Sequence, residues 1–150
     1  MYSGQGNNRG SLVLGGSSGI GRALVEQLAM RGDRVLAVAS DIRDLEALQH
    51  DCRLRHGAEI HIAAADFAAA AFDPQAFAMD CIETLGRITH LFIPLGAISD
   101  EDKGIPSPRV VGHLAMVNYV RPAQMLGSFS KHFAANGFGH AMIFTSIATA

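Results

Sequence analysis

A chain of 150 residues that is 49% hydrophobic and 17% charged has the composition of a folded domain rather than of a disordered segment. Its net charge of −2 gives no reason to expect nucleic acid or an anionic membrane surface as a partner. No apolar run approaches the roughly 20 residues that a membrane-spanning helix needs. Because residues 1–10 are polar and rich in glycine, we expect a flexible N-terminal tail followed by one domain over residues 11–150.

Cys52 and Cys81 both fall on the apolar side of an amphipathic helical pattern. This placement predicts two buried free thiols rather than a disulfide, and free thiols are typical of a reducing compartment. We therefore expect a cytoplasmic protein. The seven histidines show neither H-x-x-x-H nor H-E-x-x-H spacing, so the sequence predicts no metal site.

The most informative stretch of the chain is a glycine-rich turn between an expected strand, residues 12–14, and an expected helix that ends near Arg31. The turn reads Gly15-Gly16-Ser17-Ser18-Gly19-Ile20-Gly21. Glycine lets the chain leave the strand sharply, lets a phosphate approach the backbone, and lets the helix pack close to the sheet. The N–H groups and the positive end of the helix dipole then attract an anion. The predicted phosphate-binding residues are Gly15, Ser17, Ser18, Gly19, Ile20 and Gly21.

Strand and helix patterns alternate along the whole chain. The first helix is predicted to bury a set of apolar side chains, Ile20, Ala23, Leu24 and Leu28. Further strands are expected over residues 35–39, 60–64, 88–93 and 141–146. Further helices are expected to begin at Ser40 or Asp41, at Asp73-Pro74 and at Ser107-Pro108, the last with a bend at Pro122. This alternation predicts an α/β fold, a doubly wound, Rossmann-like parallel sheet of about five strands.

Several of these motifs together resemble the N-terminal part of a short-chain dehydrogenase/reductase. That family's cofactor turn, T-G-x-x-x-G-x-G, corresponds to residues 14–21, with Leu14 in place of the threonine. Its segment F-G-x-I-D-x-L-V-N-N-A-G corresponds to residues 85–96, with Ile93 and Pro94 in place of the two asparagines. In the family these polar groups form hydrogen bonds at one end of the sheet. Because all of them are replaced, we expect apolar packing at that end.

The resemblance also assigns roles to single residues. The family's acidic residue after the third strand, which contacts adenine, corresponds to Asp66, and Phe67 follows it. Its helix asparagine, in V-N-x-x-G-P, corresponds to Asn118, and its catalytic serine corresponds to Ser146. The implied catalytic residues are therefore Ser146 and Asn118. The implied cofactor-binding residues beyond the turn are Asp66, Phe67, Leu95 and Gly96.

Each of these assignments has a structural alternative. Ser146 can simply end a strand, Asn118 can hydrogen-bond to neighbouring backbone, and Asp66 can cap the segment that follows it. The roles therefore depend on the resemblance and not on the single residues.

The resemblance implies an NAD(P)-dependent oxidoreductase that reduces a small carbonyl compound or oxidises an alcohol, with the substrate itself unknown. The family's catalytic tyrosine and lysine, in Y-x-x-x-K, follow the serine, and neither Tyr2 nor Tyr119 has a lysine four positions later. We therefore expect this chain to supply the cofactor-binding part, incomplete at its C-terminal end, and to be inactive alone. The alternative is a non-catalytic nucleotide-binding or scaffold protein that lacks the tyrosine–lysine pair.

Cofactor choice depends on the end of the second strand. An acidic residue there accepts hydrogen bonds from the ribose hydroxyls of NAD, but the corresponding residue is Ala39. Ser40 is placed to hydrogen-bond a 2′-phosphate and Arg43 to neutralise it, whereas Asp41 favours a ribose. The sequence thus favours NADP, with NAD as the alternative. The structural alternative for Arg43 is a position on a solvated helix face.

The last expectation concerns association. In the family the sheet continues past the fifth strand, so residues 141–146 are predicted to form an exposed edge in this chain. An exposed apolar edge favours pairing, so we expect a homo-oligomer or pairing with a C-terminal remainder of the same enzyme.

Overall fold

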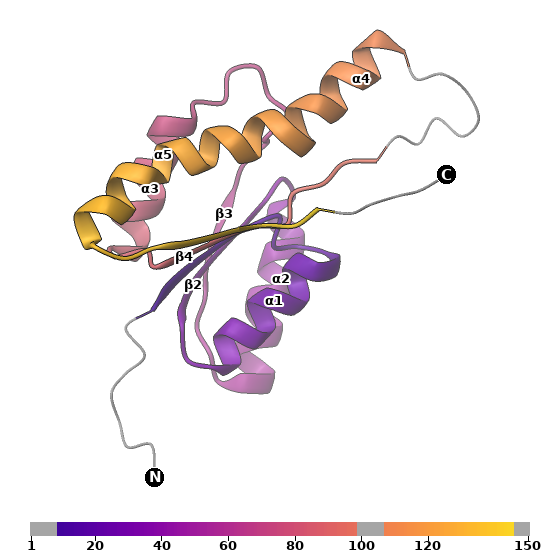
Figure 1. Ribbon diagram of the computed structural model, residues 1–150. Coiled ribbons are helices and arrows are strands. Elements are labelled where there is room, and N and C mark those ends of the chain that lie inside the picture. The colour runs from indigo at the N-terminus through magenta and orange to yellow at the C-terminus, as the bar shows by residue number, and fades with distance from the viewer. Residues whose placement is uncertain (1–8, 99–106, 146–150) are drawn as a thin grey trace.

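The computed structural model describes residues 9–98 and 107–145 (Figure 1). Within these ranges the strands are β1 (Gly10–Leu14), β2 (Arg34–Ala39), β3 (His61–Ala64), β4 (His90–Ile93) and β5 (His140–Ile143). The helices are α1 (Gly19–Met30), α2 (Ile42–His56), α3 (Pro74–Leu85), α4 (Pro108–Ala115) and α5 (Arg121–Asn136), with a π-helical turn, η1 (Met116–Val120), between the last two. Strands and helices alternate as the sequence predicts.

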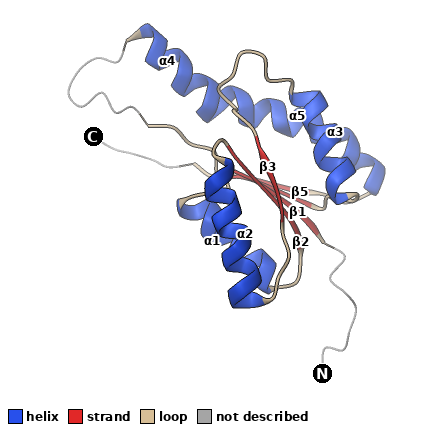
Figure 2. Ribbon diagram, turned by 180° about the vertical axis from the view of Figure 1, so that it is seen from behind, coloured by secondary structure: helices blue, strands red, loops and turns tan. Residues whose placement is uncertain are grey.

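The strands form one parallel sheet in the order β3-β2-β1-β4-β5. Helices α1 and α2 cover one face, and α3 with the long rod α4-η1-α5 covers the other, as the view from behind also shows (Figure 2). Parallel neighbours require crossover connections, and helices in those connections bury both faces of the sheet. The predicted fold class, a doubly wound Rossmann-like sheet of about five strands, is confirmed.

The central strands are buried on both faces, which is why they read as continuous apolar runs. Every residue of β1 is buried, and so is β2 after its first residue. One core lies between the sheet and α3 with α5 and includes Met125 and Phe129. A second core lies on the opposite face, against α1 and α2, and includes Val25 and Leu45. The two cores fix the sheet, so the loops at its edge start from rigid positions.

The buried face predicted for α1 is largely wrong. The helix buries Gly21, Val25, Leu28 and Ala29, whereas Ile20 is 62% exposed. The physical reason lies at Gly21, where a Cβ would overlap the carbonyl oxygen of Gly15. Only glycine fits at this closest approach of α1 to the turn, so Gly21 faces inward and the helix is rotated accordingly.

The predicted starts of helices at Asp73 and Ser107 are confirmed. Of the two residues predicted to cap α2, the structure has Asp41 in that position. Asp73 accepts hydrogen bonds from two N–H groups of the first turn of α3, at 2.9 and 3.1 Å. For α2 the cap is Asp41 rather than Ser40, because Asp41 Oδ1 accepts a hydrogen bond from the backbone N–H of Arg43 at 2.9 Å. These short side chains satisfy N–H groups that the helix itself cannot.

The sequence predicts a bend at Pro122, and the structure has a π-helical turn, Met116–Val120, that ends two residues before this proline. The N–H of Arg121 donates to the carbonyl of Met116, five residues back, so this turn is wider than an α-helical one. Proline has no N–H to donate, and a wide turn beside it lets the rod continue without a break (Figure 1).

Several boundaries differ from the predicted ones by a few residues. Gly10, expected in the tail, is the first residue of β1 and is buried. Strands β3 and β4 begin at His61 and His90 rather than at residues 60 and 88. The fifth strand covers His140–Ile143 rather than residues 141–146. Residues 1–8 of the predicted tail, and Ser146, lie outside the described residues.

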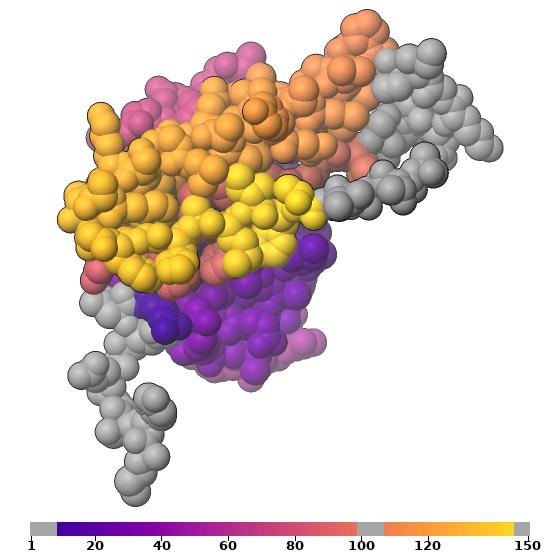
Figure 3. Space-filling view, in the orientation of Figure 1, coloured from indigo at the N-terminus to yellow at the C-terminus, as the bar shows by residue number. Residues whose placement is uncertain are grey.

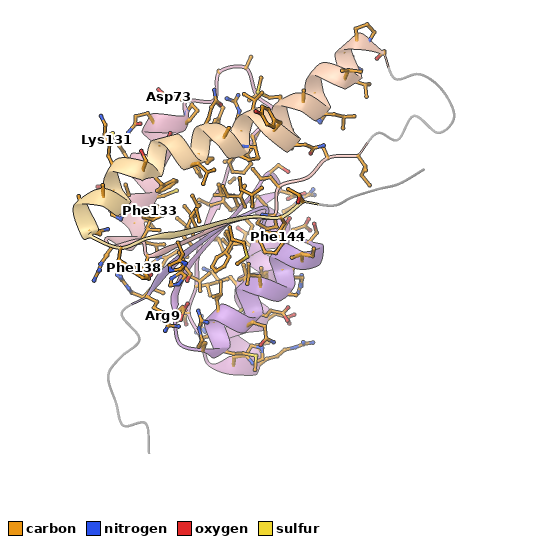
Figure 4. The ribbon with its side chains drawn as sticks, in the orientation of Figure 1. Arg9, Asp73, Lys131, Phe133, Phe138 and Phe144 are labelled. Atoms are coloured by element: carbon orange, nitrogen blue, oxygen red, sulfur yellow. The ribbon has the colours of Figure 1, made fainter. Side chains whose placement is uncertain are left out.

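Strand β5 occupies one edge of the sheet, and all four of its residues are exposed. In the space-filling view it runs across the surface of the molecule as the yellow segment (Figure 3). Figure 4 labels Phe138 before this strand and Phe144 after it. The edge predicted from the sequence is therefore open among the described residues.

Candidate functional site

A cleft of about 530 Å³ opens at the carboxyl ends of the strands. From β1 the chain crosses over in one direction to β2 and β3, and later in the other direction to β4 and β5, so the loops diverge beside β1. Every predicted cofactor-binding residue except Arg43 lines this cleft, namely Gly15, Ser17, Ser18, Gly19, Ile20, Gly21, Ser40, Asp66, Phe67, Leu95 and Gly96. The fold thus brings together residues from the loops after β1, β2, β3 and β4.

The glycine turn after β1 is held by backbone hydrogen bonds. The N–H groups of Gly15 and Gly16 both donate to the carbonyl of Val38 in β2, at 2.7 and 2.9 Å. Gly15 and Gly19 have φ angles of +92° and +50°, which L side chains rarely adopt. The glycines have different roles. Gly21 packs against the Gly15 carbonyl, whereas Gly19 has no atom within 4 Å of the position of a Cβ. The space in front of Gly19 is therefore open.

The N-terminus of α1 faces this open space without a side-chain cap. Its N-cap residue, Ser18, makes no capping hydrogen bond, and the first turn contains no acidic residue. The first N–H groups of a helix have no acceptor within the helix, and the helix dipole makes this end positive. The turn can therefore receive an anion such as a phosphate.

The loop after β4 is held by Asn118. The Asn118 Oδ1 accepts a hydrogen bond from the N–H of Ala97 at 2.7 Å, and its Nδ2 donates to the Ala97 carbonyl at 2.9 Å. Ala97 lines the cleft next to Leu95 and Gly96. The side chain of Asn118 thus binds backbone, but that of a loop 21 residues earlier and not the neighbouring backbone of its structural alternative, and in doing so it fixes one wall of the cleft. Its catalytic role stays a prediction.

The loop after β3 carries Asp66 and Phe67 into the lining of the cleft. The N–H of Ala65 donates to the Ala39 carbonyl at 2.9 Å, which continues the pairing of β3 with β2. Asp66 Oδ1 accepts a hydrogen bond from the N–H of Ala68 at 2.9 Å, which closes a local turn. Asp66 therefore has both the capping role of its structural alternative and a place at the cleft.

The most consequential residue that the sequence analysis missed is Arg121. It is only 4% exposed and lies beneath the loop after β3. Its Nε donates to the Phe67 carbonyl and its Nη2 to the Ala69 carbonyl, both at 2.7 Å. A signal for it exists in the sequence, because Val117, Arg121, Met125 and Phe129 recur every four residues along one helix face. An arginine within such an apolar stripe indicates a buried guanidinium with specific acceptors.

The pair of Arg43 and Asp41 lies outside the lining of the cleft. Arg43 Nη2 and Asp41 Oδ2 are 2.6 Å apart, and the Arg43 side chain is 83% exposed. Hydrogen bonds from the side chain and the backbone of Arg43 lower the pKa of Asp41 to about 2. The structure thus places Arg43 on a solvated helix face, while Ser40 alone of the predicted 2′-phosphate contacts lines the cleft.

The apolar packing expected below the cleft is confirmed. Leu14 and Ile93 are both fully buried in the same core. Because Val13 pairs with Phe92 in adjacent strands, the next residues of each strand lie side by side. Among the described residues, no buried side-chain nitrogen or oxygen lacks a hydrogen-bond partner.

The remaining end of the cleft is formed by Thr145, Phe144 and His113. Ser146, the predicted catalytic serine, follows Thr145 but lies outside the described residues. In the ranges 9–98 and 107–145 there is no cluster of three histidine, cysteine, aspartate or glutamate side chains that could hold a metal. The same ranges contain no helix that is long and apolar enough to cross a membrane.

The sequence profile of the family described as short chain dehydrogenase matches residues 11–150. The chain belongs to this family. Among curated proteins, the cis-2,3-dihydrobiphenyl-2,3-diol dehydrogenase of a Pseudomonas species is 36% identical to this short-chain dehydrogenase over 94 residues. That alignment covers 63% of this chain and 32% of the relative. The family resemblance seen in the motifs is thereby confirmed.

Solved structures agree on the fold. A metagenomic short-chain oxidoreductase in complex with NADP has a TM-score of 0.78 and 26% identity, over 94% of this chain and 63% of that one. A short-chain dehydrogenase from Sphingobium yanoikuyae in complex with NADPH has a TM-score of 0.78 and 24% identity, over 93% of this chain and 54% of that one. This short-chain dehydrogenase therefore spans 54–63% of the length of these solved chains and 32% of the curated relative.

Proposed function

We propose that this short-chain dehydrogenase is an NADP-dependent oxidoreductase that interconverts a small carbonyl compound and an alcohol, and that residues 11–150 bind its cofactor. The observation that carries the proposal is the open space at Gly19 in front of the uncapped N-terminus of α1. When bound, NADPH supplies a hydride to the carbonyl carbon of the substrate. The 26% identical oxidoreductase was solved with NADP, which supports the same cofactor here.

The residues of the cleft fit a dinucleotide. The cleft volume, about 530 Å³, lies within the range of about 300–1,000 Å³ typical of cofactor and ligand pockets. The glycine turn suits a pyrophosphate, because the uncapped backbone N–H groups and the dipole of α1 would attract an anion there. The adenosine end would lie toward Asp66 and Phe67, and the nicotinamide end toward Leu95 and Gly96 on the other side of β1, since a dinucleotide spans the point where the strand order reverses.

The residues at the end of β2 favour NADP over NAD. Ala39 and Ser40 line the cleft there, and Ala39 has no carboxylate to accept hydrogen bonds from a ribose or to repel a 2′-phosphate. Arg43 is paired with Asp41, but an ion pair exposed to solvent is weak. Its side chain therefore remains free to turn toward a 2′-phosphate.

Catalysis depends on Ser146 and Asn118 in this proposal. The resemblance assigns to the Ser146 hydroxyl the hydrogen bond to the substrate oxygen, and Asn118 holds the wall formed by Ala97. Neither side chain transfers a proton by itself near neutral pH. Within residues 1–150 no tyrosine has a lysine four positions later, so we expect this polypeptide alone to bind NADPH without turning over substrate.

A non-catalytic nucleotide-binding or scaffold protein is the alternative. The reading frame after residue 150 distinguishes the two. A Y-x-x-x-K motif there supports the oxidoreductase, and a stop codon supports the alternative.

Two further parts of the proposal concern association and compartment. The exposed β5 edge supports pairing with a second copy of the chain or with a C-terminal remainder of the enzyme. The free thiols of Cys52 and Cys81 are both buried, which is consistent with a reducing, cytoplasmic location.

Gly19→Ala tests the proposed binding site, with Gly57→Ala as a matched control. Both glycines have left-handed φ angles, +50° and +61°, and both have open space at the Cβ position. Each substitution therefore costs a similar amount of folding free energy, on the order of 1 kcal/mol. In a fluorescence titration with NADPH, Gly19→Ala should weaken binding at least about tenfold, because the methyl group enters the phosphate path. Gly57→Ala, at the far end of α2, should stay within about twofold. Equal affinity of both variants would contradict the proposal.

A further inference from the structure

Arg121 is a buried cation whose donors are directed at backbone carbonyls. Besides Phe67 and Ala69, it donates from Nη1 to Gln124 Oε1 at 2.7 Å, and its guanidinium carbon lies 4.9 Å from the centroid of the Phe72 ring. Among the described residues no carboxylate forms an ion pair with it. Burying an arginine in this way costs solvation, so each of its hydrogen bonds matters for keeping the site intact.

The carbonyls that Arg121 binds belong to the loop of residues 65–73, which also carries Asp66 and Phe67. This loop has little regular structure of its own, and the Phe67 ring packs against Phe72 and Phe77 with centroid distances of 5.2 and 5.7 Å. The guanidinium lies against the same aromatic group and ties two carbonyls of the loop to the rod. The orientation of the peptide between Phe67 and Ala68 therefore depends on a side chain more than 50 residues later in the chain.

The position of Arg121 also sets this chain apart from the family pattern. In V-N-x-x-G-P, which Asn118 and Pro122 match, the residue before the proline is a glycine. A glycine has no side chain to reach the loop after β3. Arg121 therefore makes a contact with this loop that a glycine at the same position could not make.

We propose that Arg121 is a positioning residue for the adenosine end of the cofactor site, because it holds the loop of residues 65–73 that places Asp66 and Phe67 in the lining of the cleft. This inference rests on the proposed function. It predicts an effect confined to ligands with an adenosine half, whereas a purely structural role for Arg121 would affect both halves of the cleft alike.

The test compares Arg121→Met, Arg121→Lys and the control Met125→Ala in the 1–150 chain. Methionine keeps the length of the side chain without its donors, and lysine keeps the charge with a donor for one carbonyl. Met125 lies one turn further along α5, is fully buried in the core that also includes Phe67, and does not itself line the cleft. Met125→Ala therefore lowers the stability while it leaves the hydrogen bonds between Arg121 and the loop in place.

The readout is the dissociation constant of each half of the cofactor, 2′,5′-ADP and reduced nicotinamide mononucleotide, at a temperature where circular dichroism shows the variants folded. Arg121→Met should weaken 2′,5′-ADP about tenfold and leave the nicotinamide half within about twofold. Arg121→Lys should recover about half of that loss on a logarithmic scale. Met125→Ala should leave both constants within about twofold.

The inference is overturned if Arg121→Met leaves 2′,5′-ADP binding unchanged, or weakens both halves equally. If Arg121→Met does not fold, Arg121→Lys decides alone. A loss of about threefold for 2′,5′-ADP, without a loss for the nicotinamide half, supports the inference, and any other pattern overturns it. A wild-type chain that binds neither half overturns the proposed function together with this inference. A wild-type chain that binds both halves, with no selective loss in the variants, overturns the inference about Arg121 alone.

Discussion

The turn after β1 and the loops after β3 and β4 face the same cleft, but they are held in place by different parts of the chain. In the turn the contacts are made by backbone, with Gly15 and Gly16 bonded to the Val38 carbonyl and Gly21 packed against the Gly15 carbonyl. These contacts require that side chains be absent. A single added methyl group is therefore enough to break this side of the cleft.

The loops after β3 and β4 are held by side chains that extend from the long rod α4-η1-α5. Asn118 binds the backbone of Ala97, and Arg121, three residues later, binds the carbonyls of Phe67 and Ala69. Here a specific functional group must be present, and each hydrogen bond contributes about 0.5–1.5 kcal/mol. From this difference we expect that one added methyl group in the turn after β1 abolishes cofactor binding. Removal of side-chain donors and acceptors that hold the loops after β3 and β4 should instead weaken binding step by step.

Gly21→Ala should have the largest effect of the substitutions considered, because a Cβ there overlaps the Gly15 carbonyl oxygen. We expect the free energy of unfolding to fall by about 3 kcal/mol or more, and NADPH binding to be lost. Urea denaturation followed by circular dichroism measures the first effect, and the fluorescence titration measures the second.

Gly127→Ala is the matched control for this prediction. Gly127 lies within α5, has no atom within 4 Å of the Cβ position, and does not have a positive φ angle. Alanine should leave the stability there unchanged or raise it by up to about 1 kcal/mol. If Gly21→Ala proves as stable as Gly127→Ala, the turn and α1 are not held by the close approach that the structure shows.

Asn118→Ala should have an intermediate effect, since it removes both hydrogen bonds to Ala97. We expect a loss of about 1–2 kcal/mol in stability and a weakening of NADPH binding by about fivefold. Because Ala97 belongs to the loop after β4, binding of 2′,5′-ADP should not change. Calorimetric titration with the two ligands measures the difference.

Two further variants sharpen the Asn118 prediction. Asn118→Asp keeps the acceptor for the Ala97 N–H but places a carboxylate oxygen against the Ala97 carbonyl, so it should be at least as damaging as alanine. Asn136→Ala, at the far end of the same rod, removes only a contact with His132 and should leave binding unchanged. Equal loss of both ligands in Asn118→Ala would show that the loops on this side are not held separately.

The same difference explains which parts of the site could be predicted from the sequence. The turn is a local motif, because a strand, spaced glycines and a helix start fall within about a dozen residues and depend on backbone geometry. The caps at Asp41 and Asp73 are local as well, and the doubly wound parallel sheet follows from the alternation of elements. The predicted face of α1 was wrong because its rotation depends on the contact between Gly21 and Gly15, which apolar spacing does not report.

The contacts on the other side could not be predicted because they join distant parts of the chain. Asn118 and Ala97 are 21 residues apart, and Arg121 and Phe67 are 54 apart. The sequence of residues 65–73 does not indicate which side chain binds the carbonyls of this loop. The arginine in the stripe of α5 indicates a buried polar contact, but only the fold shows its partner.

Arg43 should have the smallest effect, and it contrasts with Arg121 in burial. Because its side chain is 83% exposed, Arg43→Ala should leave the stability of the fold nearly unchanged. It should weaken the binding of NADPH by about threefold and leave that of NADH unchanged, since only NADPH carries the 2′-phosphate.

Asp41→Asn should have the opposite effect on NADPH binding. Asparagine keeps the helix cap, but it removes the charge that holds Arg43 and that repels a phosphate, so NADPH binding should strengthen by about twofold. Parallel titrations of both cofactors against the two variants measure these ratios. Equal changes for NADPH and NADH would remove the case for NADP and leave Arg43 as a residue of the solvated face of α2.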